Sequence, residues 1–280
     1  MRARKRFAQH FLEPAWARKV VEAIAPAPGD HVLEIGPGRG AITHTLAARV
    51  ARLVAVELDR DLAADLAARR PPNVTLVLGD ALRVDLDHML AELAAPAGDG
   101  DDAGPEPVTA RVRVVGNLPY NVASPILIRL LGLERWRSGG IADATFMLQE
   151  EVAERLLAAP GHGEYGPLSI AVQAWSEPIR LLALPPGAFR PVPKVRSTLV
   201  RLPFRRPPFA ADDLVALEGL VRSVFTLRRK TLANALRPFA SGLGRDAAAA
   251  LRTADLDGQR RPETLSLEEF ARLSRALAGR

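Results

Sequence analysis

The segment Asn117-Leu118-Pro119-Tyr120 could carry out chemistry on an exocyclic amine of a nucleobase. The N6 atom of adenine is a poor nucleophile because its lone pair is delocalised into the ring. A site that uses this atom must accept hydrogen bonds from the amine and hold the ring by its face. The Asn117 amide oxygen and the Leu118 carbonyl can accept, and the Tyr120 ring can stack. Pro119 fixes its own φ and keeps Leu118 out of the helical region, which predicts a sharp turn.

The tetrapeptide alone is equally compatible with an Asn-Pro loop that ends a strand, so the elements around it decide. The β-branched residues of the stretch 112–115 indicate a buried strand. Similar runs occur at residues 31–35, 53–57 and 74–78, and helical patterns separate them. Strands and helices that alternate at these intervals are typical of a parallel, doubly wound sheet. The predicted fold class is therefore α/β, with a Rossmann-like doubly wound sheet.

A glycine turn, Gly36-Pro37-Gly38-Arg39-Gly40, follows the first of these strands, and Glu57 ends the next. This arrangement places a nucleoside at the carboxyl edge of the sheet, with the acid on its ribose hydroxyls. The turn alone does not separate a dinucleotide site from an S-adenosylmethionine site. Its G-x-G-x-G spacing differs from the G-x-G-x-x-G of dinucleotide sites and favours S-adenosylmethionine, which has no pyrophosphate.

Asp80 ends the third strand and could accept a hydrogen bond from the adenine amine of such a cofactor. An acid at one strand end can simply cap the next helix. Gly36, Glu57, Asp80 and Asn117, however, follow four different strands, and together they are a stronger signal than any one of them.

The composition points to an intracellular protein in which the basic residues are unevenly distributed. The 280 residues include no cysteine, which excludes disulfides and thiolate metal sites. No apolar run approaches the length of a membrane span. The net charge is only +6, but no acid lies between Glu177 and Asp212 or between Glu218 and Asp246, and both stretches are rich in arginine. Either these cations form a positive surface for polyphosphate or they are solvated charges of an Arg-rich, Ala-rich chain.

The C-terminal part predicts a separate helical domain. Residues 203–208 have the composition of a linker, and residues 96–107 that of an exposed loop. Helices are predicted at residues 214–220, 221–236, 247–254 and 267–277. We therefore expect a cofactor-binding domain at residues 1–205 and a small helical domain at residues 206–280. His44, His88 and His162 are too scattered to predict a metal site.

Several stretches together resemble the small-subunit ribosomal RNA adenine dimethyltransferases, the KsgA family, nearly from end to end. The stretch at residues 225–236 is the most specific, because general methyltransferases lack it. Besides the glycine turn and the tetrapeptide, the matching stretches are Lys5–Leu12, Met147–Arg155, Tyr165–Ser169, Phe189–Ser197 and Phe225–Leu236.

The resemblance implies a class I S-adenosylmethionine-dependent methyltransferase that adds four methyl groups to the N6 atoms of two adjacent adenines near the 3′ end of 16S rRNA. We expect an enzyme of this kind to need no metal and to act in the cytoplasm on the 30S subunit or its precursor. We also expect it to be a monomer. The implied cofactor contacts are His10, Leu12, Gly36, Glu57, Asp80 and Asn117. The implied catalytic residues are Asn117, Leu118, Pro119 and Tyr120, with Phe189 as a second stacking ring. The predicted RNA contacts are Arg190, Lys194, Arg196, Arg228, Arg229 and Lys230.

Two features depart from the family pattern. His10 stands where relatives often have Asn, and the loop at residues 96–107 is longer. Two other functions stay open: a related enzyme that dimethylates one large-subunit adenine and confers macrolide resistance, and a non-catalytic RNA-binding assembly factor. The stretch at residues 225–236 and the continuation Asn121–Pro125 argue against the first. Intact Glu57, Asp80 and Asn117 argue against the second.

Overall fold

The structure is a computed structural model, and it describes residues 10–95, 111–119, 122–207, 209 and 211–279. The chain forms two compact units, one of Met1–Ala153 with Glu177–Phe204 and the other of Glu154–Ser176 with Arg205–Arg280. The loop predicted at residues 96–107 lies outside the described residues. Among the helices of the described part, none has both the length and the apolar character of a membrane span.

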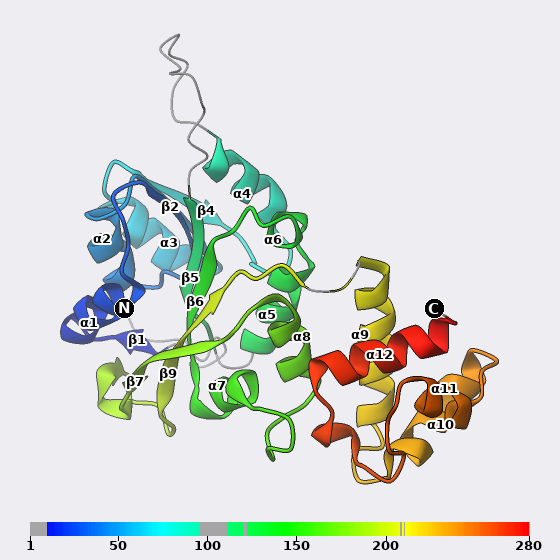
Figure 1. The fold of residues 1–280 in the computed structure, drawn as a ribbon. Helices are drawn as coiled ribbons and strands as arrows, with labels where there is room; N and C mark the ends of the chain where they lie inside the picture. The colour runs from blue at the N-terminus through cyan, green and yellow to red at the C-terminus, as the bar shows by residue number, and fades with distance from the viewer. Residues whose placement is uncertain (1–9, 96–110, 120–121, 208, 210, 280) are drawn as a thin grey trace. The chain divides into compact units, whose positions relative to one another are not determined.

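The helices and strands are distributed along the whole described chain (Figure 1). In chain order they are β1 (Phe11–Leu12), α1 (Pro14–Ile24), β2 (Asp30–Ile35), α2 (Ala41–Ala47), β3 (Arg52–Glu57), α3 (Arg60–Ala67), β4 (Val74–Leu78), α4 (Leu86–Ala94), β5 (Arg111–Asn117), α5 (Ala123–Gly132), α6 (Glu134–Arg137), β6 (Asp143–Gln149), α7 (Glu150–Leu157), α8 (Pro167–Trp175), β7 (Ile179–Leu184), β8 (Phe189–Arg190), β9 (Ser197–Pro203), α9 (Ala211–Phe225), α10 (Leu232–Gly242), α11 (Ala247–Thr253) and α12 (Leu267–Ala278).

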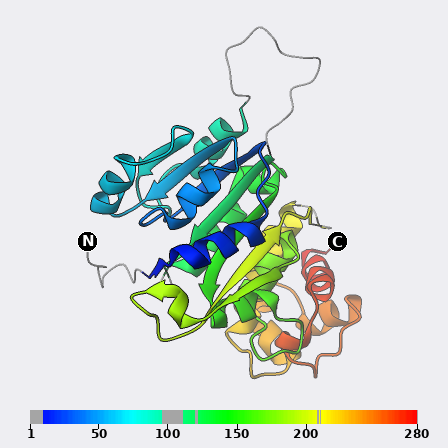
Figure 2. The ribbon, with the colours of Figure 1, turned by 90° about the vertical axis from the view of Figure 1, so that its left-hand side faces the viewer.

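The first unit is a doubly wound α/β fold, as the sequence predicts. Its seven-stranded sheet has the order β4-β3-β2-β5-β6-β9-β7. The strands from β4 to β6 are parallel, and β9 is antiparallel to both β6 and β7. Helices α1, α2 and α3 cover one face and α4, α5 and α6 the other, and Figure 2 shows α1 crossing the first of these faces. Helices on both faces explain why the central parallel strands are mostly buried and rich in apolar residues.

The register of the parallel strands brings four strand ends together. Ile35 at the end of β2 is paired with Val56 of β3 on one side and with Gly116 of β5 on the other. Glu57 is paired with Leu78 at the end of β4. A Cβ atom on Gly116 would lie 2.7 Å from the Ile35 carbonyl oxygen, so this close pairing requires glycine. The predicted site residues at the ends of these strands therefore share one edge of the sheet.

Arg113 lies at the opposite edge of the sheet, near the amino ends of β2, β5 and β6. Its guanidinium is 1% exposed, and all five of its N–H groups have an acceptor. Nε and Nη2 lie 3.0 Å from the two carboxylate oxygens of Asp143, and Nη1 lies 3.0 Å from Asp30. Nη1 and Nη2 also donate to the carbonyls of Ala25 and Ile24, at 3.1 and 2.9 Å. One buried cation thus joins the C-terminus of α1 to the first residues of β2 and β6.

The second unit is a helical bundle. Helices α8, α10 and α12 pack on α9, and α11 packs on α10 and α12. The α12 N-terminus has a capping box, in which Ser266 Oγ accepts from the Glu269 N–H and the Glu269 carboxylate accepts from the Ser266 N–H. Arg260 donates to both oxygens of Glu269, at 2.5 and 2.9 Å. These contacts fix how the segment before α12 enters the helix.

The prediction of one helix at residues 221–236 is wrong. Helix α9 ends at Phe225 and α10 begins at Leu232, and residues 214–220 belong to the same helix as Phe225. The N–H groups of Leu232 and Ala233 donate to the carbonyls of Arg260 and Gly258, at 2.7 and 3.0 Å. These partners are distant in sequence, and they satisfy the first N–H groups of a new helix, so the break is not visible in the local pattern.

We expect Arg113→Met to lower the free energy of unfolding by about 3–5 kcal/mol, because it leaves the buried Asp30 carboxylate without its cation and leaves Asp143 with only the half-exposed Arg111 at 3.7 Å. Urea denaturation followed by far-UV circular dichroism measures the loss. Arg49→Met removes an exposed arginine from the same unit and is the matched control, with an expected change within about 0.5 kcal/mol. Equal stability of the two variants would contradict this role for Arg113.

Candidate functional site

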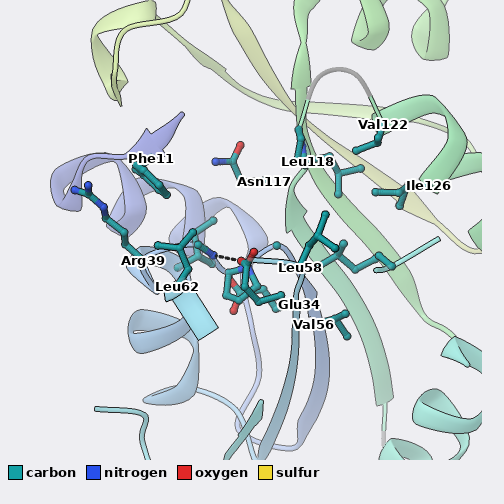
Figure 3. A pocket seen from close by; sticks show the side chains of 18 of the residues that line it. Phe11, Glu34, Arg39, Val56, Leu58, Leu62, Asn117, Leu118, Val122 and Ile126 are labelled. Carbon is teal, nitrogen blue, oxygen red and sulfur yellow. Dashed lines mark hydrogen bonds between the residues drawn. The ribbon is translucent and has the colours of Figure 1, made fainter. Parts of the chain in front are cut away.

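A cavity lies at the carboxyl edge of the sheet in the first unit, where the four strand ends meet (Figure 3). The segment before α1 closes one side, and the loop after β5 and the start of α5 close the other. The residues that line it are His10, Phe11, Leu12, Glu34, Ile35, Gly36, Pro37, Gly38, Arg39, Ala41, Ile42, Val56, Glu57, Leu58, Leu62, Gly79, Asp80, Ala81, Asn117, Leu118, Pro119, Val122 and Ile126.

The structure brings most of the predicted site residues into this one cavity. All six residues predicted to contact the cofactor line it, namely His10, Leu12, Gly36, Glu57, Asp80 and Asn117. Leu118 and Pro119 line it as well, and Tyr120 lies outside the described residues. Segments that are far apart in sequence therefore converge as the sequence predicts, while their individual roles stay predictions.

Phe189 does not line the cavity. Its side chain is 1% exposed and belongs to the apolar core between the sheet and helices α1 and α2. In this conformation the ring has no free face for a nucleobase. A stacking role would require the ring to leave the core, so this role stays a prediction that the geometry does not favour.

Asn117 ends β5 and points its side chain into the cavity (Figure 3). Its Nδ2 donates to the backbone carbonyl of His10 at 3.0 Å. A carbonyl oxygen can only accept, so this contact fixes which end of the amide carries the nitrogen. The amide oxygen is thereby turned away from His10 and is the end that can accept a hydrogen bond from a donor in the cavity.

The glycine turn has the backbone shape that only glycine adopts easily. Gly36, Gly38 and Gly40 have φ values of 71°, 58° and 78°. The Gly38 N–H donates to Glu57 Oε2 at 2.9 Å, and the Asp59 N–H donates to Oε1 at 2.8 Å. The carboxylate also accepts from the backbone of Leu58, and its remaining lone pair is available to a hydroxyl in the cavity. Burial raises the pKa of Glu57, in spite of these backbone hydrogen bonds.

Glu34 is a second carboxylate in the cavity, and we did not predict it as a site residue. Its side chain is 1% exposed, and Oε2 has no hydrogen-bond partner within the described part of the chain. Burial raises its pKa to about 7, and the neighbouring charge of Glu57 acts in the same direction. A buried oxygen without a partner is costly unless it is protonated or binds a donor. The spacing Glu34-x-Gly36 was the signal that could have identified it.

The remaining wall of the cavity is mostly apolar. Leu58 is 50% exposed although it is a large hydrophobic residue, and it lines the cavity with Val122 and Ile126 (Figure 3). Phe11 lies over the glycine turn and is itself covered by the Arg39 guanidinium at 4.4 Å. A site of this kind suits a ligand with one flat apolar part and several hydrogen-bond donors. Leu58 and Ile126 were not predicted as site residues, because they belong to none of the sequence motifs named above.

The predicted RNA contacts differ in how free their side chains are. Lys194 and Arg196 are exposed on the segment that joins β8 to β9, whereas Arg190 is exposed in β8 itself and lies 3.6 Å from the Glu13 carboxylate. Arg229 and Lys230 are exposed in the turn before α10. Arg228 instead donates to the Gly163 carbonyl at 2.6 Å and lies 3.6 Å from the Glu263 carboxylate. Arg228 therefore has a structural partner, which the local sequence did not indicate.

Within the described ranges, no three His, Asp or Glu side chains lie close enough together to hold a metal ion. The absence of a metal from the reaction stays a prediction.

The sequence matches the ribosomal RNA adenine dimethylase family over residues 1–278. A protein of Acinetobacter baylyi named ribosomal RNA small subunit methyltransferase A is 43% identical over 98% of this chain and 92% of its own length. Proteins of the same name from Pseudomonas putida and Anaeromyxobacter dehalogenans are each 42% identical over 99% of this chain and over 96% and 94% of their own lengths.

Two solved structures are similar over nearly the whole chain. A dimethyladenosine transferase from Plasmodium falciparum has a TM-score of 0.71 at 21% identity, covering 94% of this chain and 96% of its own. The 23S rRNA methyltransferase ErmE has a TM-score of 0.65 at 25% identity, covering 96% and 99%. Both agree with the predicted class of fold, a class I methyltransferase domain followed by helices.

We expect Glu34→Gln to change how stability depends on pH. A carboxyl with a folded pKa of about 7 binds more protons folded than unfolded, where the value is 4.5. Its stability contribution is therefore present below pH 4.5 and is lost as the pH rises through about 7. Unmodified protein should lose about 3 kcal/mol relative to Glu34→Gln between pH 4.5 and pH 8. Urea denaturation at a series of pH values measures this, and parallel profiles would contradict it.

Proposed function

The chain belongs to the ribosomal RNA adenine dimethylase family, and from this premise we propose that it adds four methyl groups to the N6 atoms of two adjacent adenines near the 3′ end of 16S rRNA. The chain is an S-adenosylmethionine-dependent methyltransferase. The observation that carries the proposed site is the orientation of Asn117, whose amide nitrogen is bound by His10 while its side chain points into the cavity.

The residues of the cavity fit S-adenosylmethionine. This cofactor has two ribose hydroxyls, an adenine amine and two positive groups, all of which favour acids as partners. Glu57, Asp80 and Glu34, whose Oε2 has no partner in the described part of the chain, supply three acids in one cavity. Leu58 and Ile126 supply apolar surface for a flat ring. When bound, the cofactor supplies a methyl group on a sulfonium, whose leaving group is a neutral thioether.

Asn117 and Leu118 prepare the amine of the target adenine. The Asn117 Oδ1 and the Leu118 carbonyl accept hydrogen bonds from N6, which localises its lone pair and orients it. The target adenine must leave its stack, at a cost of a few kcal/mol, and stacking on Tyr120 would return about 1–3 kcal/mol. Most of the rate enhancement comes from holding two reactants in line, so the chain needs no general base. Proton loss from N6 follows the attack, to solvent or to a nearby carbonyl.

The second methyl transfer restricts the same site further. After one transfer N6 has lost one of its two donors, so one of the two acceptors must tolerate a missing hydrogen bond. For the second transfer, the single remaining N–H can still donate to one of the two acceptors. A site with two acceptors therefore suits dimethylation of each adenine.

The substrate we propose is folded 16S rRNA in the 30S subunit or its precursor, because two adjacent adenines carry too little sequence information alone. The exposed cations of the segment between β8 and β9 and of the turn before α10 would bind phosphates and give affinity and orientation. We further propose that the protein acts in the cytoplasm as a monomer.

The two other functions are less well supported. The 42–43% identity to small-subunit methyltransferases extends over the whole chain, whereas ErmE is 25% identical. A non-catalytic assembly factor would have no need for three acids and an oriented amide in one cavity.

We expect Asn117→Ala to lower kcat by at least about 100-fold, because N6 loses one of the acceptors that orient it. Affinity for undermethylated 30S particles should be nearly unchanged, since the amide carries no charge. Single-turnover transfer from labelled S-adenosylmethionine and filter binding of the particles measure the two quantities. A variant as active as the unmodified protein would refute this role of Asn117.

We expect Arg229→Glu to weaken particle binding and to reduce the slope of log K against log salt by about one unit. Arg229 is exposed, whereas Arg228 is held by Gly163 and Glu263, so Arg229 tests phosphate contact without disturbing the bundle. Arg229→Lys keeps the charge and is the matched control, with the slope retained. An unchanged slope in Arg229→Glu would place this turn outside the RNA footprint.

A further inference from the structure

The segment before α1 is bound to the loop that carries three of the predicted RNA contacts. Phe11 and Leu12 of β1 pair with Arg190 and Phe189 of β8. The Glu13 N–H donates to the Ala188 carbonyl at 2.9 Å. The Glu13 carboxylate also lies 3.6 Å from Arg190. A movement of one segment therefore displaces the other, because two strands and an ion pair join them.

His10 extends this connection to Asn117. Its ring Nδ1 lies 2.7 Å from the Pro191 carbonyl, and its own carbonyl accepts from Asn117 Nδ2 at 3.0 Å. Since a carbonyl can only accept, Nδ1 must carry the hydrogen. One residue thus makes a side-chain contact to the β8–β9 loop and a main-chain contact to the residue that ends β5.

The loop between β8 and β9 has exposed side chains that suit contact with RNA. Lys194 and Arg196 are exposed, and so are Val192 and Val195, at 54% and 43%. Pro193 is buried between them and anchors the loop. Phosphates that bind these cations would fix the backbone that includes the Pro191 carbonyl.

We propose that His10 is a positioning residue that transmits the placement of the β8–β9 loop to the amide of Asn117. This inference rests on the proposed function and deepens it. With the loop held by RNA, the His10 ring is held by Pro191, and its carbonyl keeps Asn117 Nδ2 turned away from the cavity. Asn117 Oδ1 then faces the target amine. Without the ring contact the His10 backbone is less constrained, and the amide spends less time in the productive orientation.

The chemistry of the side chain allows a sharp test. Asn carries its amide nitrogen on Cγ, where His carries Nδ1, whereas Gln carries it one atom further out, as His carries Nε2. His10→Asn can therefore keep the bond to Pro191, and His10→Gln cannot place its donor at the same point. His10→Ala removes the donor altogether. If His10 instead acts on the cofactor through Nε2, Gln should replace it better than Asn.

We expect His10→Ala to lower kcat on undermethylated 30S particles by about tenfold, the effect of one lost orienting hydrogen bond. The loss in kcat should exceed any change in the KM for S-adenosylmethionine, because the contact to Pro191 orients Asn117 and leaves the acids of the cavity in place. His10→Asn should recover most of the loss and His10→Gln little of it. Thermal unfolding of all three variants verifies that each is folded.

Three results would overturn the inference: equal kcat in His10→Ala and the unmodified protein, better recovery with Gln than with Asn, or a loss confined to the KM for the methyl donor. Failure of the unmodified protein to methylate the particles would instead refute the proposed function itself. The two failures are therefore distinguishable in one set of assays.

A double-mutant cycle tests the direction of the coupling. Lys194→Ala should raise the KM for particles and lower kcat in the unmodified background. In the His10→Ala background the same change should raise KM while leaving kcat at the value of His10→Ala alone. An equal kcat loss in both backgrounds would show that the loop does not act through His10.

Discussion

The architecture of the first unit depends on the burial of one guanidinium at the amino ends of its strands. Arg113 is 1% exposed and satisfies two carboxylates and two carbonyls at the C-terminus of α1. A buried charge is tolerated only when its hydrogen bonds are complete, so the geometry allows little variation. The strands β2, β5 and β6 are thereby held in one register. The same register brings four strand ends together at the opposite edge, where the cavity lies.

The cavity contains two features that are unfavourable in the free protein. It holds a buried carboxylate with an unpartnered oxygen and a large exposed leucine. Both features cost stability in the free protein, and both are relieved by a ligand with donors and a flat ring. Asn117 belongs to both the sheet and the cavity, because it ends a strand and presents its amide to the cavity.

Agreement between sequence and structure was closest where a chemical group follows a strand directly. Gly36, Glu57, Asp80 and Asn117 were predicted from strand ends and all line one cavity. The interpretation failed where partners come from distant segments. Helix α10 begins at Leu232 because Arg260 and Gly258 accept from its first N–H groups, and Arg228 is tied to Gly163 and Glu263. The Phe189 ring is in the core for the same reason, since β1 pairs with β8.

The sequence by itself determined the alternation of strands and helices, the glycine turn and the residue types at the strand ends, because periodicity and backbone preference are local properties. Only the tertiary structure decided which way the Asn117 amide points, which carboxylate lacks a partner and which arginines are exposed. These depend on contacts across long sequence separations, such as the 107 residues between His10 and Asn117, and no local pattern encodes them. The sequence thus predicted the fold class, but it did not predict how the side chains of the candidate site are oriented.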